Sequence, residues 1–321
     1  ARAPAGRCGA ARVRAAAMCS TWRQRLFLDD KENNISHPFS GKVRLLAIAL
    51  NYEGSESPLN CVVDAERLCD VARQAKVKDV VKMYDTGDTE KFPCKAEVEE
   101  EIRAIAKRCQ PHDYFVLSYS GHGANQENED AQNGLDSLLC LRTRSGEDDF
   151  MVDDDLAGLI SEVFPPTIRV LVLADACHSA GVLDCDTPGI WGKRKVCALS
   201  GCQDTQCSVD TGDGGAMTNA LLKVLGRQKV KALRRKRQVS VQYIFNRMVQ
   251  FMPDDDEDEE QEDEPSTDEE EDDDESGEVE DSDEDDEGEV DPITGEEPDE
   301  GQTINLSWPG GCDPSKICFP F

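Results

Sequence analysis

Apolar residues lie along the chain in two alternating patterns. A continuous, β-rich apolar run predicts a buried strand at residues 43–50, and shorter segments predict strands at 80–84, 114–119, 138–141, 169–174, 196–199 and 302–307. Apolar residues that recur every three or four positions predict helices at residues 59–75, 95–109, 153–163, 215–225 and 239–251. Strands that alternate with helices are typical of an α/β domain, in which helices cover both faces of a mostly parallel sheet.

The net charge of the chain comes from one segment. The 321 residues carry a formal net charge of −32, and residues 254–300 hold 32 Asp and Glu side chains but no Lys or Arg. The remaining residues carry 35 acidic and 35 basic side chains. Such a segment cannot bury enough apolar surface to order itself. We therefore expect residues 253–300 to be a disordered insertion between a folded domain at 41–252 and a final strand and tail at 301–321.

Residues 1–40 are expected to form a separate N-terminal extension. Residues 1–28 contain six Arg and no acidic residue, which is a composition found in transit peptides. The sequence starts with Ala, so the alternative is an over-extended gene model in which Met18 is the true start. Both alternatives stand at the level of the sequence.

The 14 cysteines indicate reduced thiols and not a disulfide scaffold. Several of them, such as Cys61, Cys69 and Cys140, fall inside apolar periodic segments, and no Cys-x-x-Cys pair favours a zinc ribbon. The longest apolar runs are too short to span a bilayer, and a neutral body does not favour nucleic acid as a partner. We expect a monomer in the cytoplasm, with the nucleus or an organelle as alternatives.

Cys177 and His122 each follow a predicted strand, and functional groups gather beyond the carboxyl ends of parallel strands. A thiol attacks a carbonyl as the thiolate, and His is the natural base at neutral pH. Glycines flank His122 on both sides and permit a sharp turn, and a backbone N–H near Cys177 or Gly123 is a candidate oxyanion donor. The alternative is that Cys177 is only a buried thiol and His122 only a loop residue.

The motifs at 120–123 (Ser-Gly-His-Gly) and 175–179 (Asp-Ala-Cys-His-Ser) resemble the two signatures of metacaspases, which are caspase-like cysteine peptidases. The resemblance covers residues 43–225, resumes at 302–307, and includes segments 200–206 and 214–218. It implies a caspase-like three-layer sandwich with a mostly parallel central sheet. It also implies a Cys177–His122 dyad, in a type without a long linker between its large and small subunits.

One position departs from the family pattern near the proposed nucleophile. Ala180 stands where the family usually has Gly, which is tolerable unless the backbone φ there is positive. His178 is a rival base, but its place beside Cys177 in the sequence suits loop packing better.

The resemblance also implies a specificity. Metacaspases cleave after Arg or Lys, and the residues that match their substrate pocket are Cys61, Asp64, Ser120 and Asp175. Two carboxylates can grip a guanidinium through parallel charged hydrogen bonds. The alternative for Asp64 is an exposed acid on a helix.

Many metacaspases need calcium, which prefers several oxygen ligands. The residues that match the calcium site of the family are Asp136, Asp153, Asp154 and Asp184. The alternative is that the acids at 153–155 only start a helix, because acidic side chains suit a helix N-terminus.

Two functions therefore compete. The first is a calcium-activated cysteine endopeptidase that cleaves after Arg or Lys and could cut itself at residues 193–195 (Lys-Arg-Lys). The second is a catalytically silent interaction protein whose acidic tract at 254–300 binds basic partners. The seven Lys and Arg at 227–237 are a nuclear signal, a solvated loop or the partner of that tract, which is itself either regulatory or a passive solubilising insert.

Overall fold

The computed structural model describes most of the chain between residues 41 and 252, together with its C-terminal segment. The described residues are 13–14, 35, 39, 41–87, 90–128, 134–187, 189–202, 214–235, 238–252 and 302–321, with the backbone alone at 13–14 and 227–235. Several predicted parts lie outside the described residues. They are the insertion at 253–300, most of the N-terminal extension, residues 203–206 of the segment 200–206 that resembles the family, and the side chains of the basic residues at 227–237.

The main sheet has seven strands in the order β1-β10-β9-β8-β4-β2-β3. Their bounds are Val13–Arg14 (β1), Val43–Ala49 (β2), Asp79–Tyr84 (β3), Tyr114–Ser120 (β4), Arg169–Asp175 (β8), Lys195–Ser200 (β9) and Asn305–Ser307 (β10). The strands from β3 through β2, β4 and β8 to β9 are parallel, whereas β10 runs antiparallel to β9 and to β1. The mostly parallel sheet predicted from the sequence is confirmed.

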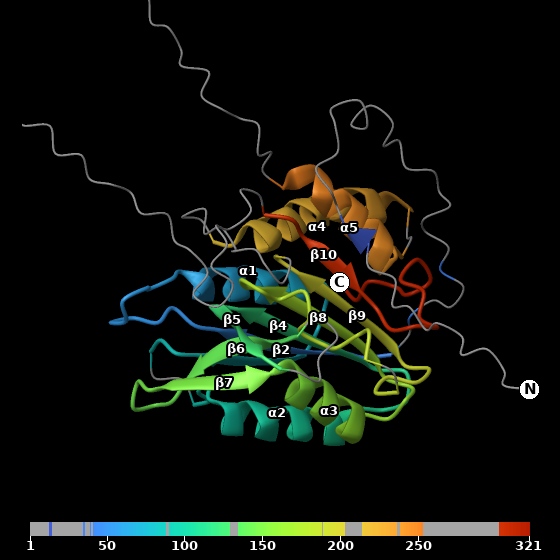
Figure 1. Ribbon diagram of the computed structural model, residues 1–321. Helices are drawn as coiled ribbons and strands as arrows, with labels where there is room; N and C mark the ends of the chain where they lie inside the picture. The colour runs from blue at the N-terminus through green and yellow to red at the C-terminus, as the bar shows by residue number, and fades with distance from the viewer. Residues whose placement is uncertain are drawn as a thin grey trace, which may run out of the picture. The chain divides into compact units, whose positions relative to one another are not determined.

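Helices cover both faces of this sheet (Figure 1). One face carries α1 (Cys61–Gln74), α4 (Ala216–Arg235) and α5 (Val241–Met248), which is followed by a 3-10 turn at Val249–Phe251. The other face carries α2 (Lys95–Arg108) and α3 (Asp153–Val163). This arrangement confirms the three-layer α/β sandwich. No helix in the described part of the chain is long and apolar enough to cross a membrane.

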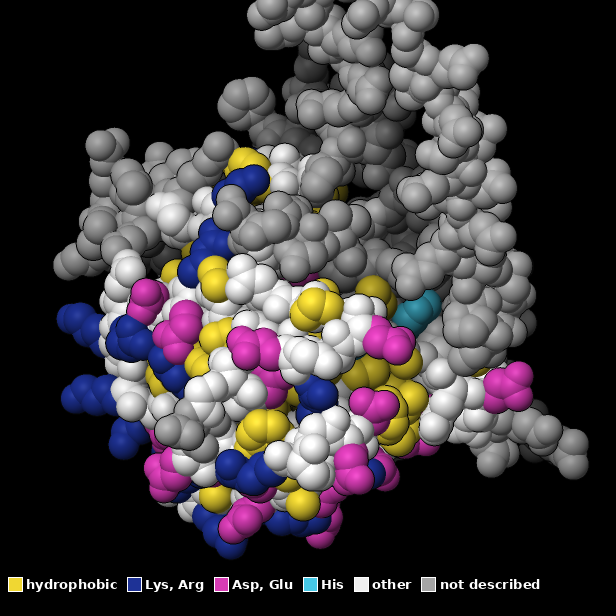
Figure 2. Space-filling model, turned by 90° about the vertical axis from the view of Figure 1, so that its left-hand side faces the viewer, with side chains coloured by type: hydrophobic (Ala, Val, Ile, Leu, Met, Phe, Trp, Pro, Cys, Tyr) yellow, Lys and Arg dark blue, Asp and Glu magenta, His cyan; other side chains and the backbone are white. Residues whose placement is uncertain are grey.

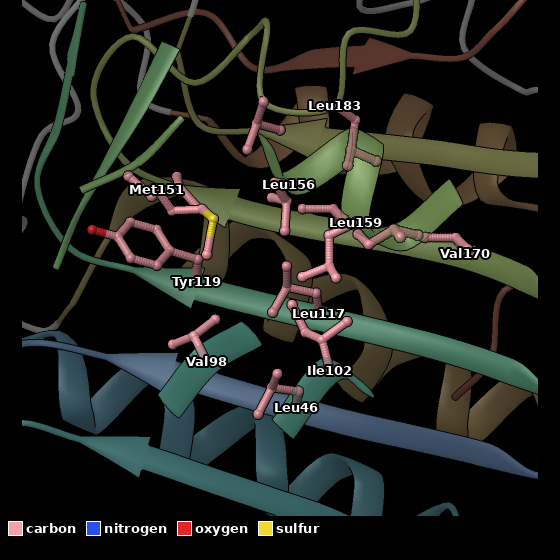
Figure 3. Packing of buried hydrophobic residues seen from close by; sticks show 14 of the residues in the cluster. Leu46, Val98, Ile102, Leu117, Tyr119, Met151, Leu156, Leu159, Val170 and Leu183 are labelled. Carbon is pink, nitrogen blue, oxygen red and sulfur yellow. The ribbon is translucent and has the colours of Figure 1, made fainter. Parts of the chain in front are cut away.

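Two apolar cores lie between the layers, one on each face of the sheet. Every residue of β4 and β8 is buried, as expected for parallel strands covered on both sides. Figure 3 shows the core beneath α2 and α3. There the strand residues Leu46, Leu117 and Val170 pack in one cluster with Val98, Ile102, Leu156 and Leu159 of the two helices. Full burial of each such side chain is worth roughly 1.5–3 kcal/mol.

A second, antiparallel sheet was only partly predicted. It has the order β5-β6-β7, with bounds Gly123–Glu127, Leu135–Arg142 and Asp148–Val152. The sequence indicated only the middle strand, at 138–141, because β5 contains no β-branched or aromatic residue and β7 starts with two Asp. Helix α4 is longer than predicted, since the basic run that follows residue 225 consists largely of good helix formers.

Candidate active site

The two candidate catalytic residues leave the sheet at neighbouring positions. Ser120 at the end of β4 pairs in register with Asp175 at the end of β8. The peptide N–H of Gly121 donates to the carbonyl of Asp175 at 3.3 Å, which extends the contact by one residue. His122 and Cys177 each lie two residues beyond this register pair. Parallel pairing therefore brings the two loops to the same carboxyl edge of the sheet.

Gly123 holds these two loops together. A Cβ atom built on Gly123 would lie 2.0 Å from the carbonyl oxygen of Cys177 and 3.3 Å from the Cβ of Ala176. No side chain fits at that distance, so the approach of the backbones requires glycine. His122 and Cys177 are both half-buried, which leaves each side chain partly accessible. The alternative of a fully buried Cys177 thiol is wrong.

The imidazole of His122 is oriented by a backbone carbonyl. Its Nε2 atom lies 2.7 Å from the carbonyl oxygen of Ser57. A carbonyl can only accept a hydrogen bond, so Nε2 carries the proton in the neutral ring and Nδ1 keeps the lone pair. The loop that contains Ser57 is anchored at its start, because the N–H groups of Asn51 and Tyr52 donate to the Asp85 carboxylate, each at 2.7 Å.

The chain turns sharply after Cys177. His178 adopts a left-handed conformation with φ of +51°, and the Ser179 hydroxyl donates to the carbonyl of Ala176 at 2.8 Å. His is among the residues that tolerate this region of φ and ψ better than most. Ala180 is buried and is not among the described residues with positive φ. The departure from the family pattern at this position therefore adds no backbone strain.

Asp64 of α1 and Asp175 of β8 meet at the start of α4. Asp64 accepts a hydrogen bond from the N–H of Gly215, and Asp175 accepts one from the N–H of Thr218, each at 2.8 Å. A Cβ on Gly215 would lie 2.3 Å from an Asp175 carboxylate oxygen. Asp64 is only 2 % exposed and Asp175 only 5 %, so the alternative of an exposed helix acid is wrong for Asp64. Arg67 lies 3.8 Å from the other Asp64 oxygen.

The remaining two pocket candidates lie at the same edge. Ser120 is the buried last residue of β4, and Cys61 is the half-buried first residue of α1. The structure thus places Cys61 and Asp64 in the first turn of α1, and Ser120 beside Asp175 in the sheet.

The four candidate calcium ligands come from three elements. Asp136 lies on β6, Asp153 and Asp154 start α3, and Asp184 lies in the connection from β8 to β9. One Asp153 oxygen accepts from the N–H of Ser137 at 2.8 Å and the other accepts from the N–H of Asp154 at 2.9 Å. A Cβ on Gly181 would lie 3.4 Å from the Asp153 carboxylate, so the Cys177–Asp184 segment packs against the start of α3.

Negative charge is crowded among these carboxylates. Burial, with the nearby charges of Asp136 and Asp154, raises the pKa of Asp153 from 3.8 to about 7. Burial and the neighbouring acids, Asp153 first among them, raise the pKa of Asp184 from 3.8 to about 8. One Asp184 oxygen is buried with no hydrogen-bond partner. Both shifts penalise the charged form, which a cation would favour.

The donor chemistry suits a hard cation, but the arrangement is not that of a finished coordination sphere. Across the described residues, no group of three or more His, Cys, Asp or Glu side chains is arranged to hold a metal ion. The Asp136 oxygens accept hydrogen bonds from the amides of Asn128 at 2.7 Å and Gln126 at 3.1 Å. Carboxylate oxygens are the ligands that Ca²⁺ prefers. Side chains would have to move for these four acids to share an ion.

Sequence reasoning missed the groups that orient the site. Ser57, Tyr52 and Asp85 position His122 or its partner loop, and Gly215 and Thr218 orient the two pocket acids. All five act through a backbone group or at a backbone group of a partner, for which side-chain patterns carry no signal. On the face drawn in Figure 2, the described acidic and basic side chains are interspersed.

Comparison with known proteins gives a consistent result. Residues 43–186 match the sequence profile described as metacaspase, peptidase C14 domain. Metacaspase-1 of Eremothecium gossypii is 28% identical over 226 residues, which are 65% of this chain and 50% of that protein. Metacaspase-1 of Kluyveromyces lactis is 30% identical over 162 residues, which are 47% of this chain and 37% of that protein. The chain thus spans half or less of the length of these two relatives.

Among solved structures, a crystal structure of a Geobacter sulfurreducens protein superposes with a TM-score of 0.49 at 26% identity. The match covers 66% of this chain and 89% of that one.

Proposed function

We propose that this chain, whose residues 43–186 match the profile of the metacaspase, peptidase C14 domain, is a metacaspase: a calcium-activated cysteine endopeptidase that cleaves after Arg or Lys. The observation that carries the proposal is the contact between Gly123 and the carbonyl of Cys177. It joins the loop of a candidate base to the loop of a candidate nucleophile at the carboxyl edge of the sheet. Nucleophilic catalysis by a thiol needs such a pair.

In the proposed mechanism, His122 accepts the thiol proton of Cys177 at Nδ1. The resulting thiolate attacks the scissile carbonyl carbon, and the carbonyl electrons move to the oxygen of a tetrahedral intermediate. As the C–N bond breaks, His122 returns the proton to the leaving amine, and an acyl-enzyme on Cys177 remains. Water then attacks this thioester while His122 takes its proton, and the acid product leaves as the thiol reforms.

The carbonyl of Ser57 keeps His122 ready for this cycle. By accepting the Nε2 proton at 2.7 Å it leaves Nδ1 as the basic nitrogen in the neutral ring. When Nδ1 takes the thiol proton, the same carbonyl faces an imidazolium, and a hydrogen bond from a charged donor is stronger than one from a neutral donor. A backbone carbonyl thus serves as the orienting third group that a catalytic His needs.

The pocket acids support a preference for basic side chains. The N–H groups of Gly215 and Thr218 fix the orientation of Asp64 and Asp175. Both carboxylates are buried, so a substrate guanidinium or ammonium that reached them would be attracted at low effective dielectric. An acidic substrate side chain would instead meet like charge, which disfavours cleavage after Asp.

Calcium would be held by Asp136, Asp153, Asp154 and Asp184, and when bound it would supply the positive charge that these crowded acids lack. Asp184 lies in the same connection as Cys177, with φ of +43°. A change at Asp184 therefore reaches the nucleophile loop through the short segment that packs against α3.

The candidate self-cleavage site is partly sequestered by its own contacts. Arg194 donates from its guanidinium to the carbonyl of Phe164 at 2.7 Å and to that of Ser161 at 2.6 Å, which caps the end of α3. Cleavage after Arg194 would require these bonds to break. Lys193 and Lys195 are both exposed, but Lys195 is paired with Arg169 in the sheet. We propose that any self-cleavage in this segment occurs after Lys193.

A panel of fluorogenic peptides with Arg, Lys or Asp before the cut tests the proposal. The full chain is incubated with each peptide in calcium or in chelator, beside a Cys177→Ala control. The expected result is cleavage of the Arg and Lys peptides in calcium only, with none by Cys177→Ala. Cleavage of the Asp peptide alone would overturn the specificity, and activity that persists in Cys177→Ala would overturn the mechanism.

A further inference from the structure

Two tyrosine hydroxyls form hydrogen bonds with the backbone N–H and carbonyl of His122. The N–H of His122 donates to the Tyr52 hydroxyl at 2.9 Å. The Tyr119 hydroxyl donates to the carbonyl of His122 at 2.6 Å. The two hydroxyl oxygens lie 3.1 Å apart and both lie within hydrogen-bond distance of the carbonyl of Cys140, at 2.6 and 2.7 Å. These contacts hold the backbone of the candidate base from both sides.

More than one assignment of the hydroxyl protons fits these contacts, and in one of them the tyrosines bind both the N–H and the carbonyl of His122. Each tyrosine has a single hydroxyl proton. In that assignment, Tyr52 gives its proton to the carbonyl of Cys140, which leaves its oxygen lone pairs for the N–H of His122. Tyr119 gives its proton to the carbonyl of His122. Burial raises the pKa of both tyrosines above the usual value of 10.0, so both hydroxyls keep their protons at neutral pH.

The same tyrosine also touches the imidazole ring. The ring centroids of Tyr52 and His122 lie 4.5 Å apart with an angle of 45° between the planes. Tyr52 therefore limits ring rotation on one side while Ser57 binds Nε2 on the other. A Cβ on Gly121 would lie 2.7 Å from the Tyr52 hydroxyl and 2.8 Å from the Tyr119 hydroxyl. The glycine before His122 therefore leaves space for these two hydroxyls.

The backbone of Tyr52 is itself held in an unusual conformation. Its φ of +50° is rare for a bulky residue. The Asp85 carboxylate accepts the N–H of Tyr52 at 2.7 Å, and the Tyr52 side chain is almost wholly buried. Strained conformations of this kind persist where their surroundings over-determine them, and they cluster at functional sites. This conformation directs the hydroxyl to the peptide of His122.

From this network we propose that Tyr52 is a positioning residue that fixes the candidate base His122, with Tyr119 as its partner. The inference rests on the proposed peptidase function. Tyr52 acts through His122 and not on the substrate, so its loss should lower kcat and leave KM nearly unchanged. Loss of one neutral hydrogen bond to the base should lower kcat by roughly threefold to tenfold. Loss of both hydroxyls should cost more than either alone, since the two share one network.

The test uses the full chain in calcium with the peptide that the wild type cleaves best. Tyr52→Phe and Tyr119→Phe remove one hydroxyl each and keep the ring, and Tyr243→Phe on α5 is the matched control. We expect a lower kcat with KM within about twofold of wild type for the first two variants, and wild-type values for the control. Wild-type kcat in both Tyr52→Phe and Tyr119→Phe would overturn the inference. An increase in KM with no change in kcat would also overturn it. Should Tyr52→Phe fail to fold, Tyr119→Phe carries the same test.

A second measurement separates this inference from the proposed function. Nitrogen NMR of the imidazoles in the inactive Cys177→Ala background reports the tautomer of His122, with His122→Gln to assign the signal. We expect a dominant Nε2–H form with Tyr52 present and a smaller excess of that form in Tyr52→Phe, because a less firmly held His122 backbone lets the ring leave the Ser57 carbonyl more often. An unchanged tautomer in Tyr52→Phe would count against the positioning role. A wild type that cleaves no peptide would contradict only the proposed function, since this readout does not need turnover.

Discussion

Asp64 on α1 and Asp175 at the end of β8 meet around a single glycine, Gly215 at the start of α4. The N–H of Gly215 donates to Asp64, and its Cα faces the Asp175 carboxylate so closely that an added Cβ would lie 2.3 Å from an oxygen. Two buried carboxylates are costly to bring together unless a cation or hydrogen bonds compensate them. The N–H groups of Gly215 and Thr218 and the Arg67 guanidinium compensate part of this cost. We interpret the pair as a pocket for a basic side chain.

Neutralising either pocket acid should weaken cleavage of basic substrates. Asp175→Asn and Asp64→Asn keep the size and one acceptor but remove the charge. Loss of a hydrogen bond to a charged group costs roughly 1.5–3 kcal/mol, or about 10- to 100-fold in kcat/KM on an Arg peptide. Asp70→Asn on the exposed side of α1 is the control and should leave kcat/KM unchanged. Equal kcat/KM in all three variants would rule out the pocket.

The thiol of Cys177 should be indispensable for turnover. Cys177→Ala is expected to abolish cleavage of an Arg peptide, and His122→Ala to reduce kcat nearly to background, because the nucleophile needs both its thiol and a base. Cys94→Ala removes a half-buried thiol at the start of α2, away from the site, and should keep wild-type kcat. A Cys177→Ala enzyme with residual turnover above buffer would place the nucleophile elsewhere.

A small substitution at Gly123 should cause a large loss of kcat. In Gly123→Ala the new methyl would meet the Cys177 carbonyl at 2.0 Å, so one loop must move and the His122–Cys177 geometry changes with it. We expect a loss of about 100-fold in kcat, as for misplacement of a catalytic group by about 1 Å.

Gly158→Ala is the matched control for that substitution. A Cβ at Gly158, in the middle of α3, meets nothing within 4 Å, and Ala is a better helix former than Gly by about 1 kcal/mol. This variant should keep wild-type kcat and gain a few degrees in Tm. A Gly123→Ala enzyme with the kcat of Gly158→Ala would show that the loop contact is dispensable.

The crowded acids should make stability depend on pH. The pKa of Asp184 is raised from 3.8 to about 8 and that of Asp153 to about 7. A carboxyl whose pKa is raised in the folded state stabilises that state when it is protonated. This contribution to the free energy of unfolding is complete below pH 4 and is lost as the pH rises through 7 and 8. In chelator, Tm should therefore fall between pH 5 and pH 9. Asp184→Asn should flatten that fall, whereas Asp148→Asn on exposed β7 should not.

Calcium should act on the same range of pH. A cation that binds the charged acids stabilises the folded state, so the rise in Tm on addition of calcium should be larger at pH 8.5 than at pH 5.5. The rise should shrink in Asp184→Asn. A calcium response that is equal at both pH values, and unchanged by Asp184→Asn, would contradict a site at these acids.

The two strands that the sequence did not predict in the small sheet share a physical cause. The sequence-based ranges for β2, β4, β8 and β9 agree with the structure to within a residue or two, because a strand buried on both faces is largely apolar. Strands β5 and β7 were missed because they are held mainly by backbone pairing with β6, at a partly exposed sheet whose side chains are under weaker constraint. Burial requires apolar residues and is therefore visible in the sequence, whereas backbone hydrogen bonds between strands place little constraint on residue type.

The sequence by itself determined the α/β architecture and placed both His122 and Cys177 directly after buried strands. The resemblance of its motifs to metacaspases also singled out two sets of acids, Asp64 with Asp175 and the group around Asp184, as predictions. The tertiary structure alone decided which backbone atoms serve them: the Ser57 carbonyl for His122, the Cys177 carbonyl against Gly123, and the N–H of Gly215 for Asp64. Almost every residue offers the same N–H and C=O groups, so residue identity does not reveal which of them folding will bring to the site.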